Sequence, residues 1–247
     1  MMVKVLSLFA AVVLGMSACA ADEDPIRVAF SFDDGSKDHH TYAAKMLEDR
    51  GWRGMFCIVT DKIGRGDRFM TWENVNDLIR RGHEIASHTV THANLGKLSK
   101  SGDLGEVRRQ VVDSREEIVS RTGVAPRVLC LPWGSADDNV KRIIAEAGMK
   151  PTERRRSPAG AGFPSAAERY REWRKMGLTG VDLMFHGIRA EGGGWKAYKT
   201  LDDFAAMLDG IAALEREGKV IVTDYEGMRS GCTLNGGAYP HHGELGK

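Results

Sequence analysis

Short apolar runs alternate with longer amphipathic segments along most of the 247-residue chain. The apolar runs have the length and composition of strands, whereas the amphipathic segments repeat apolar positions at helical spacing. This pattern predicts strands over residues 27–33, 54–60, 84–87, 127–131, 181–185 and 219–224. It predicts helices over residues 40–50, 72–81, 103–121, 137–147 and 201–216, most of which are followed closely by a glycine.

The alternation of strands and helices indicates the fold class. Successive strand–helix units form a parallel sheet, because each helix returns the chain to the same edge of the sheet. No linker and no repeat of fixed period divides the chain after residue 20, so we expect one large domain. We therefore predict an α/β fold, a distorted or incomplete (β/α) barrel with about seven parallel strands.

Residues 1–20 have the layout of a secretory signal peptide. Lys4 supplies a positive charge, residues 5–14 are apolar, and the small residues around Cys19 resemble a cleavage site. The apolar run is shorter than the roughly 20 residues that a membrane span requires. We expect an exported protein, periplasmic or extracellular.

The same segment does not determine whether the exported chain keeps a lipid anchor or becomes soluble. Residues 16–19 resemble a bacterial lipoprotein box, so cleavage before Cys19 would leave a lipid anchor, whereas cleavage after Ala20 would leave a soluble protein. A lipid anchor at Cys19 is the only attachment to a membrane that we expect. The remaining chain is predicted to consist of a catalytic domain at 21–230 and a C-terminal tail at 231–247.

The charge balance and the cysteine count exclude two classes of protein. The chain has 35 basic and 34 acidic residues, and removal of Lys4 with the signal peptide makes the counts equal. A neutral chain does not favour nucleic acid or an anionic membrane as a partner. Without Cys19, three cysteines remain, an odd number that cannot form a complete disulfide framework. Cys57 and Cys130 have apolar neighbours and are expected to be buried.

Two adjacent carboxylates lie at the end of the first predicted strand. Asp33 and Asp34 precede Gly35, where the chain turns, so both side chains can face one pocket. Because two close anions repel each other, a metal cation beside them is favourable: one carboxylate would ligate it and the other would accept a proton from water. The alternative is a polar turn at a strand end, since Asp-Gly is a common turn dipeptide.

His88 and His92 follow the third predicted strand and are four residues apart. If this segment forms one helical turn, both imidazoles lie on one side, as in other zinc-binding His pairs. With Asp34 they would form a site of two His ligands and one carboxylate, which leaves a coordination position for water, as in catalytic metal sites. The alternative is a pair of buried histidines that form hydrogen bonds.

Four motifs in this order resemble those of the polysaccharide deacetylase family, carbohydrate esterases related to chitin and peptidoglycan deacetylases. They are Ser-Phe-Asp-Asp-Gly at 31–35, His-Thr-Val-Thr-His at 88–92, Cys-Leu-Pro-Trp-Gly at 130–134 and Leu-Met-Phe-His at 183–186. The resemblance extends from residue 27 to about residue 225 and also implies a barrel fold.

The resemblance implies roles for five of these residues. Asp34, His88 and His92 would hold a divalent metal, with zinc expected and cobalt, nickel or manganese also suited to these ligands. Asp33 would be the general base, and His186 would be the general acid that protonates the leaving group.

Three further residues are expected to contact the substrate. The resemblance implies that the backbone N–H of Trp133, next to Pro132, helps to stabilise the oxyanion. Trp195 follows three glycines and is expected either to stack on a sugar at the cleft rim or to be partly buried in a flexible loop. In contrast, His39 and His40 are expected at the surface, and Trp173 is expected to pack in the interior.

The sequence departs from the family pattern at two motifs. Cys130 stands where most members have Arg, so the charge that normally accompanies the catalytic base is absent there. One of the three arginines at 154–156 is a candidate replacement. The fourth motif, an Asp-x-x-x-Trp-like element, has a poor counterpart in Glu172 and Trp173.

These patterns together predict a metal-dependent hydrolase that removes N- or O-linked acetyl groups from a polysaccharide or oligosaccharide outside the cytoplasm. The expected partner is an acetylated glycan. Two alternatives stay open: a catalytically degenerate relative that binds carbohydrate, and a hydrolase of the same fold that acts on small cyclic amides.

Overall fold

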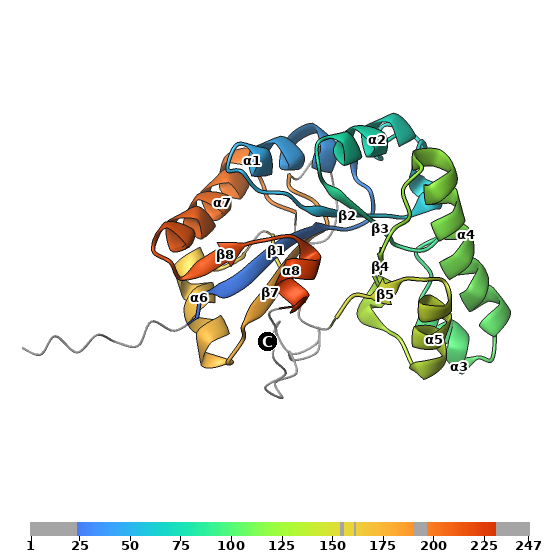
Figure 1. Ribbon diagram of the computed structural model, residues 1–247. Coiled ribbons are helices and arrows are strands. Elements are labelled where there is room, and N and C mark those ends of the chain that lie inside the picture. Colours follow the sequence, from blue (N-terminus) through green and yellow to red (C-terminus); the bar gives the residue numbers. More distant parts are fainter. Residues whose placement is uncertain (1–23, 154–155, 161, 190–196, 231–247) are drawn as a thin grey trace, which may run out of the picture.

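The computed structural model describes residues 24–153, 156–160, 162–189 and 197–230 (Figure 1). Within these residues, eight strands form one sheet, and all strand pairings are parallel. The strand order is β5-β4-β3-β2-β1-β7-β6, with β8 paired to β1. The strands are β1 (Ile26–Phe32), β2 (Met55–Ile58), β3 (Glu84–Ser87), β4 (Val128–Leu129), β5 (Lys150–Pro151), β6 (Arg156–Pro158), β7 (Gly180–Phe185) and β8 (Val220–Val222).

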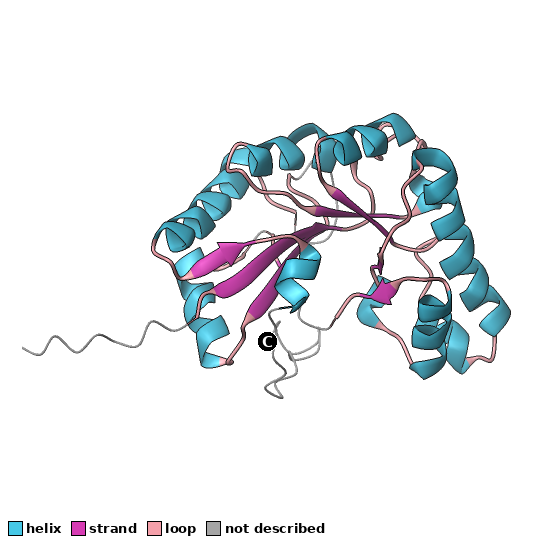
Figure 2. Ribbon diagram, in the orientation of Figure 1, coloured by secondary structure: helices cyan, strands magenta, loops and turns pink. Residues whose placement is uncertain are grey.

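Helices cover the outer face of the curved sheet, whereas α8 lies on its inner side (Figures 1 and 2). The helices are α1 (Ala44–Glu48), α2 (Trp72–Arg80), α3 (Leu95–Lys100), α4 (Leu104–Thr122), α5 (Asp138–Glu146), α6 (Ala166–Lys175), α7 (Leu201–Arg216) and α8 (Tyr225–Ser230). A π-helix (His39–Ala43) precedes α1, and 3-10 turns follow β2 (Thr60–Lys62) and β4 (Pro132–Gly134).

The central strand β1 is buried on both faces. Phe30 and Phe32 point to the helices and stack on Phe185 of β7, with ring centroids 6.4 and 5.1 Å away. Ala29, which directly precedes Phe30, points to the inner side, where α8 covers a smaller cluster through Tyr225. Because side chains alternate along a strand, β1 contributes residues to the core on both faces of the sheet.

The long helices begin and end where the sequence predicts. Asp103 caps α4 by accepting the N–H of Glu106 at 3.0 Å, and Gly123 ends it with a left-handed φ of 72°. An L-residue with a side chain adopts this conformation at a cost that glycine avoids. The predicted helix at 103–121 therefore corresponds closely to α4.

The fold class is confirmed as a parallel α/β half-barrel. The barrel is open because β5 and β6 lie at opposite ends of the strand order, although only residues 152–155 separate them in sequence. These two strands contain two and three residues and were not predicted, because so few residues show no periodicity. The unpredicted helices are α3, α6 and α8.

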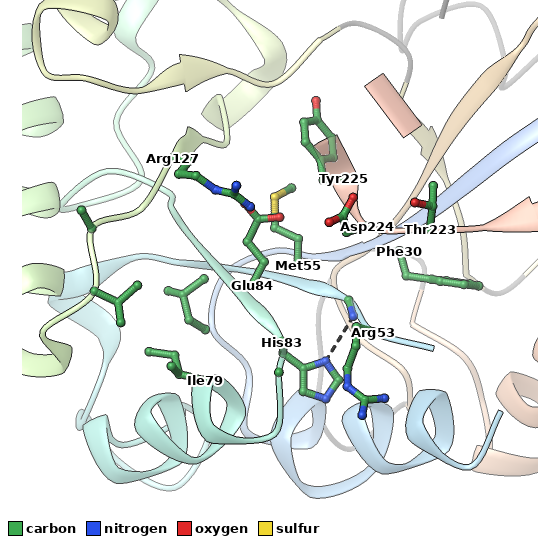
Figure 3. A pocket seen from close by; sticks show the side chains of 15 residues that line it. Phe30, Arg53, Met55, Ile79, His83, Glu84, Arg127, Thr223, Asp224 and Tyr225 are labelled. Carbon is green, nitrogen blue, oxygen red and sulfur yellow. Dashed lines mark hydrogen bonds and ion pairs between the residues drawn. The ribbon is translucent and has the colours of Figure 1, made fainter. Parts of the chain in front are cut away.

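A cavity of about 360 Å³ lies at the amino ends of β2, β3 and β4 (Figure 3). It forms where β8 and β2 pair with different halves of the same edge of β1. Glu84 faces Arg127 across 3.5 Å there, and burial raises the pKa of Glu84. None of the predicted site residues that the structure describes lines this cavity, so it is separate from them.

Several predictions concern other parts of the chain. Among the described residues, no helix has the length and apolar character needed to cross a membrane. The predicted signal peptide at 1–20, the lipoprotein box and the tail at 231–247 lie outside the described residues. Trp195 also lies outside them, as do Arg154 and Arg155.

Candidate metal and catalytic site

The predicted site residues gather at the carboxyl ends of β1, β3, β4 and β7. The N–H of Asp33 donates to the carbonyl of Phe185 at 2.8 Å, so His186 comes next to Asp33 in the register of β1 and β7. The N–H of Cys130 donates to the carbonyl of Ser87, the last residue of β3, at 2.7 Å. The carboxyl ends of parallel strands meet at the same edge, where barrels of this kind assemble their sites.

Asp34, His88 and His92 form one cluster, in which their ligand atoms lie within 4.8 Å of one another. Nε2 of His92 is 3.6 Å from Oδ1 of Asp34, and the two imidazole centroids are 4.7 Å apart. Nδ1 of His88 donates to the carbonyl of Cys130 at 2.9 Å, while its buried Nε2 has no hydrogen-bond partner. An imidazole oriented in this way fits metal ligation through Nε2.

The segment that contains both histidines is not a helical turn. Thr89 and His92 have φ values of 67° and 65°, outside the right-handed helical region. The helical turn that would place both imidazoles on one side is therefore not formed: a bend with left-handed residues brings the two imidazoles together. Asp34 and Trp133 also have positive φ, and together these are the four non-glycine residues with this conformation in the described chain. Such backbone strain is typical of functional sites.

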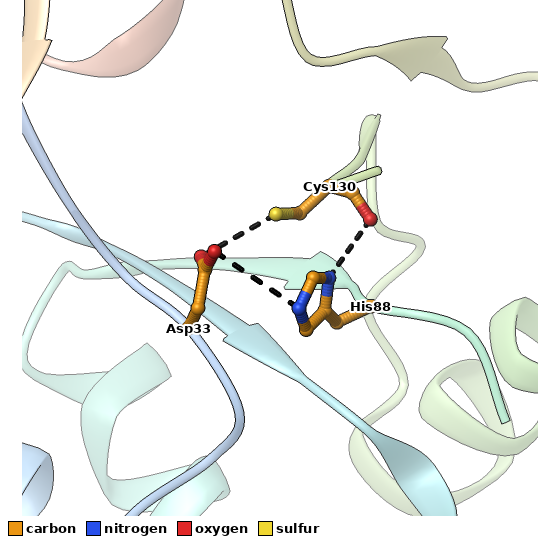
Figure 4. A group of neighbouring side chains, drawn as sticks. All are labelled: Asp33, His88 and Cys130. Atoms are coloured by element: carbon orange, nitrogen blue, oxygen red, sulfur yellow. Dashed lines mark hydrogen bonds and ion pairs between the residues drawn. The ribbon is translucent and has the colours of Figure 1, made fainter. Parts of the chain in front are cut away.

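Asp33 lies beneath this cluster and is only 2% exposed. The thiol of Cys130 donates to its Oδ1 at 3.3 Å, and Nε2 of His88 is 4.0 Å from its Oδ2 (Figure 4). Asp33, His88 and Cys130 also have the spacing of metal ligands, but all three are buried. A catalytic metal needs a position open to water, so the more accessible cluster with Asp34 and His92 fits one better.

The pKa values of the three clustered groups shift in different directions. Burial opposes the charged form of His88, but the neighbouring Cys130 and Asp33 raise its pKa to about 9. Burial and the charge of His88 lower the pKa of His92 to about 4. The pKa of Asp34 is lowered, because His88 and Lys62 outweigh its burial. At neutral pH, Asp34 and His92 are therefore ready to ligate a metal, whereas His88 must first lose a proton.

Two residues at this site have no signal in the sequence motifs. Nζ of Lys62 donates to Oδ1 of Asp34 at 3.0 Å from the 3-10 turn after β2. His39, which we expected at the surface, is fully buried, so that prediction is wrong. Its Nε2 donates to the carbonyl of His186 at 2.9 Å, and its ring packs on Phe32. Because the residues next to His39 in the sequence are polar, the sequence pattern did not indicate that His39 is buried.

The two described substrate-contact candidates differ in exposure. Trp133 is 69% exposed, and its ring centroid lies 5.6 Å from that of His92. Pro132 is buried and begins the 3-10 turn that presents Trp133 at the rim. Trp173, the poor match to the fourth motif, is fully buried in the core as expected from packing.

The sequence matches a family model described as Polysaccharide deacetylase over residues 20–152. It is 28% identical over 120 residues to a chitin deacetylase of Arthroderma benhamiae and 25% identical over 121 residues to chitin deacetylase 1 of Cryptococcus neoformans var. grubii serotype A. These matches include 48% and 49% of this chain. They include 31% and 24% of the relatives, so the chain spans only a minor part of the length of these proteins.

Solved structures share the fold at low identity. A peptidoglycan N-acetylglucosamine deacetylase gives a TM-score of 0.60 at 19% identity, covering 83% of this chain and 88% of that one. A CE4-family pseudoenzyme from Bacillus anthracis gives a TM-score of 0.60 at 14% identity, covering 84% and 66%. At such identities, the likeness concerns the fold alone, and it agrees with the half-barrel.

Proposed function

Because the chain belongs to the polysaccharide deacetylase family, we propose that it is a metal-dependent hydrolase that removes acetyl groups from a polysaccharide or oligosaccharide. The observation that most supports this function is the cluster of Asp34, His88 and His92 beside the buried carboxylate of Asp33. It contains separate groups for metal ligation and for proton transfer, as metal-assisted hydrolysis requires.

Asp34, His88 and His92 are the proposed ligands of a divalent metal. Zinc is the expected ion, and cobalt, nickel or manganese would accept the same two imidazoles and one carboxylate. Bound there, the cation would polarise the acetyl carbonyl and make water more acidic.

Asp33 is the proposed general base, and His186 the proposed general acid. The thiol of Cys130 occupies one carboxylate oxygen of Asp33, which orients the carboxylate toward the cluster. His186 follows β7 directly beside Asp33 in the strand register, where its imidazole would protonate the leaving amine or hydroxyl. The backbone N–H of Trp133 is proposed to donate to the oxyanion.

The proposed substrate is an acetylated glycan outside the cytoplasm. The exposed indole of Trp133 beside His92 offers an apolar face on which a sugar ring can stack. The signal-peptide pattern of residues 1–20 supports export, which would give the enzyme access to extracellular or cell-wall polymers.

Acetate release from acetylated xylan and from N-acetylglucosamine oligomers tests this function and distinguishes ester from amide cleavage. We expect the metal-loaded protein to release acetate from one of the two substrates. We expect His92→Ala to release at least about 100-fold less, because it removes a ligand of the metal that assists the reaction. No release from a folded, metal-bound protein on either substrate would contradict the proposal and favour a carbohydrate-binding relative or a small-amide hydrolase.

A further inference from the structure

We propose that Lys62 competes with the divalent metal for Asp34 and thereby weakens metal binding at the site. This inference rests on the proposed function, because it takes Asp34 as a metal ligand. Lys62 belongs to none of the family motifs in this sequence, so its place in the site comes from the structure alone.

The ammonium of Lys62 and the metal would use the same ligand atom. Nζ of Lys62 is 3.0 Å from Oδ1 of Asp34, the oxygen that also lies 3.6 Å from Nε2 of His92. A metal ligated by Asp34 and His92 would therefore lie close to the ammonium of Lys62. Like charges at this distance repel, and a partly buried site screens them less than bulk water does.

Lys62 is held in place from the side of the histidine ligands. The N–H of Thr60 donates to the carbonyl of Thr89 at 3.2 Å, and the N–H of Asp61 donates to that of Val90 at 3.0 Å. These bonds fasten the turn that contains Lys62 to the segment between the two histidines. The position of the lysine backbone is thus coupled to the ligands.

The residues that follow Lys62 pack against the turn of the two aspartates. The N–H of Met70 donates to the carbonyl of Gly35 at 3.0 Å, and Cδ1 of Ile63 would be 2.9 Å from a Cβ at Gly35. Nζ of Lys62 lies 5.6 Å from the ring centroid of Phe69. The Lys62 side chain is 32% exposed, so much of its stem is packed while its ammonium contacts Asp34.

The charge of Lys62 already acts on the ligands. It is one of the causes that lower the pKa of Asp34 and of His92. It also neutralises one of two adjacent carboxylates that would otherwise repel each other. Removal of this charge would leave Asp34 fully available to a divalent cation, which is why we expect tighter metal binding.

Calorimetric titration of the full chain with Zn²⁺ tests the inference in three variants. Lys62→Met keeps an apolar stem without the charge, and we expect about tenfold tighter binding than in the wild type. Lys62→Arg keeps the charge and is expected to retain the wild-type affinity. Arg65→Met is the matched control, since Arg65 lies on the same segment but pairs with Asp61 at 2.9 Å; its affinity is expected to stay within about twofold of the wild type.

The outcomes separate this inference from the proposed function. Wild-type binding with unchanged or weaker affinity in Lys62→Met would overturn the inference and leave the proposed function intact. An equal gain in affinity in Arg65→Met would also overturn it, because a general loss of positive charge would then explain the effect. A folded wild type that binds no metal would overturn both. Circular dichroism verifies folding, and Lys62→Gln replaces Lys62→Met if that variant does not fold.

Discussion

At the scale of single residues, the site contains backbone conformations that are energetically unfavourable for residues other than glycine. Asp34, Thr89, His92 and Trp133 all have a positive φ without being glycine. Each such residue costs on the order of 1 kcal/mol or more, which the surrounding packing must offset. The strained residues include two of the three proposed ligands, so the fold maintains this geometry at some expense of stability.

Substitution of Cys130 would show how much Asp33, the proposed general base, depends on the hydrogen bond that it accepts from the Cys130 thiol. Its thiol donates to Oδ1 of Asp33, and a hydrogen bond to a charged group contributes about 1.5–3 kcal/mol. We expect Cys130→Ala to lower kcat/KM about tenfold and to move the acidic limb of the pH–rate profile to higher pH, because the ionised carboxylate loses a donor.

Cys57→Ala is the matched control for this measurement. Cys57 is equally buried, in the same cluster as Cys130, so both changes remove the same volume from the core. Equal kinetic effects in the two variants would show that packing, and not the hydrogen bond, is responsible. Cys130→Ser keeps a donor and should retain most of the activity.

The raised pKa of His88 predicts a pH-dependent metal affinity. With a pKa of about 9, His88 is protonated at neutral pH and must lose its proton to ligate through Nε2. Metal affinity should therefore fall about tenfold for each pH unit below this pKa, with about one proton released per metal bound. Calorimetry in buffers of different ionisation enthalpy counts the protons, and an affinity that is constant from about pH 6 to about pH 8 would contradict the prediction.

The sequence made some site residues easier to predict than others. Asp33 and Asp34 were proposed because they are adjacent at a strand end, and His88 and His92 because of their spacing. Lys62 was missed because its contact with Asp34 arises from tertiary packing of a loop. Spacing is also compatible with a helical turn at the histidines, since it does not reveal residues with positive φ.

At the scale of secondary-structure elements, capping residues determine where helices begin. Thr71 accepts the N–H of Asn74 at 3.3 Å, and the side chain of Asn74 accepts the N–H of Thr71 at 3.0 Å. This capping box starts α2, which packs against β3 and α4. Reciprocal bonds of this kind satisfy two N–H groups that the first turn leaves without partners.

Thr71→Ala should lower the free energy of unfolding by about 1 kcal/mol, because it removes one side of the capping box. Urea denaturation of the two proteins at the same pH measures this difference. Thr71→Ser keeps the hydroxyl and serves as the control. A loss of equal size in Thr71→Ser would indicate that the methyl group, and not the cap, stabilises the helix.

Element length largely decided which elements could be predicted. The strongly amphipathic α2 and the long helix α4 were found within a few residues, whereas β5 and β6 are too short to show a period. Helix α6 was missed because only Ala166 and Trp173 on it are buried, and most of its other residues are charged. Its place in the fold depends on tertiary contacts that the local pattern does not contain.

At the scale of the whole molecule, the parallel sheet separates two regions. The carboxyl ends of the strands hold the candidate site, and the amino ends of β2 to β4 border the cavity beside β8. The open barrel leaves β5 and β6 as edge strands of the same sheet. The proposed ligands lie in the loops that directly follow β1 and β3, so a bound metal would connect segments on either side of β2.

Metal binding should therefore stabilise the entire fold. A ligand present at 100 times its dissociation constant raises the free energy of unfolding by about 2.7 kcal/mol. We expect the thermal midpoint of the wild type to rise with added Zn²⁺ and to return after chelation. His92→Ala should show little of this rise, and an equal rise in this variant would place the metal elsewhere.

Acetate release with metal removal and restoration tests the central claim most directly. One preparation is assayed metal-loaded, after chelation and after reloading, beside metal-loaded Asp33→Asn. We predict that release stops on chelation and returns on reloading, and that Asp33→Asn binds metal normally but releases acetate about 100-fold or more slowly. Release that persists after complete chelation, or that is unchanged in Asp33→Asn, would contradict hydrolysis by this metal and base.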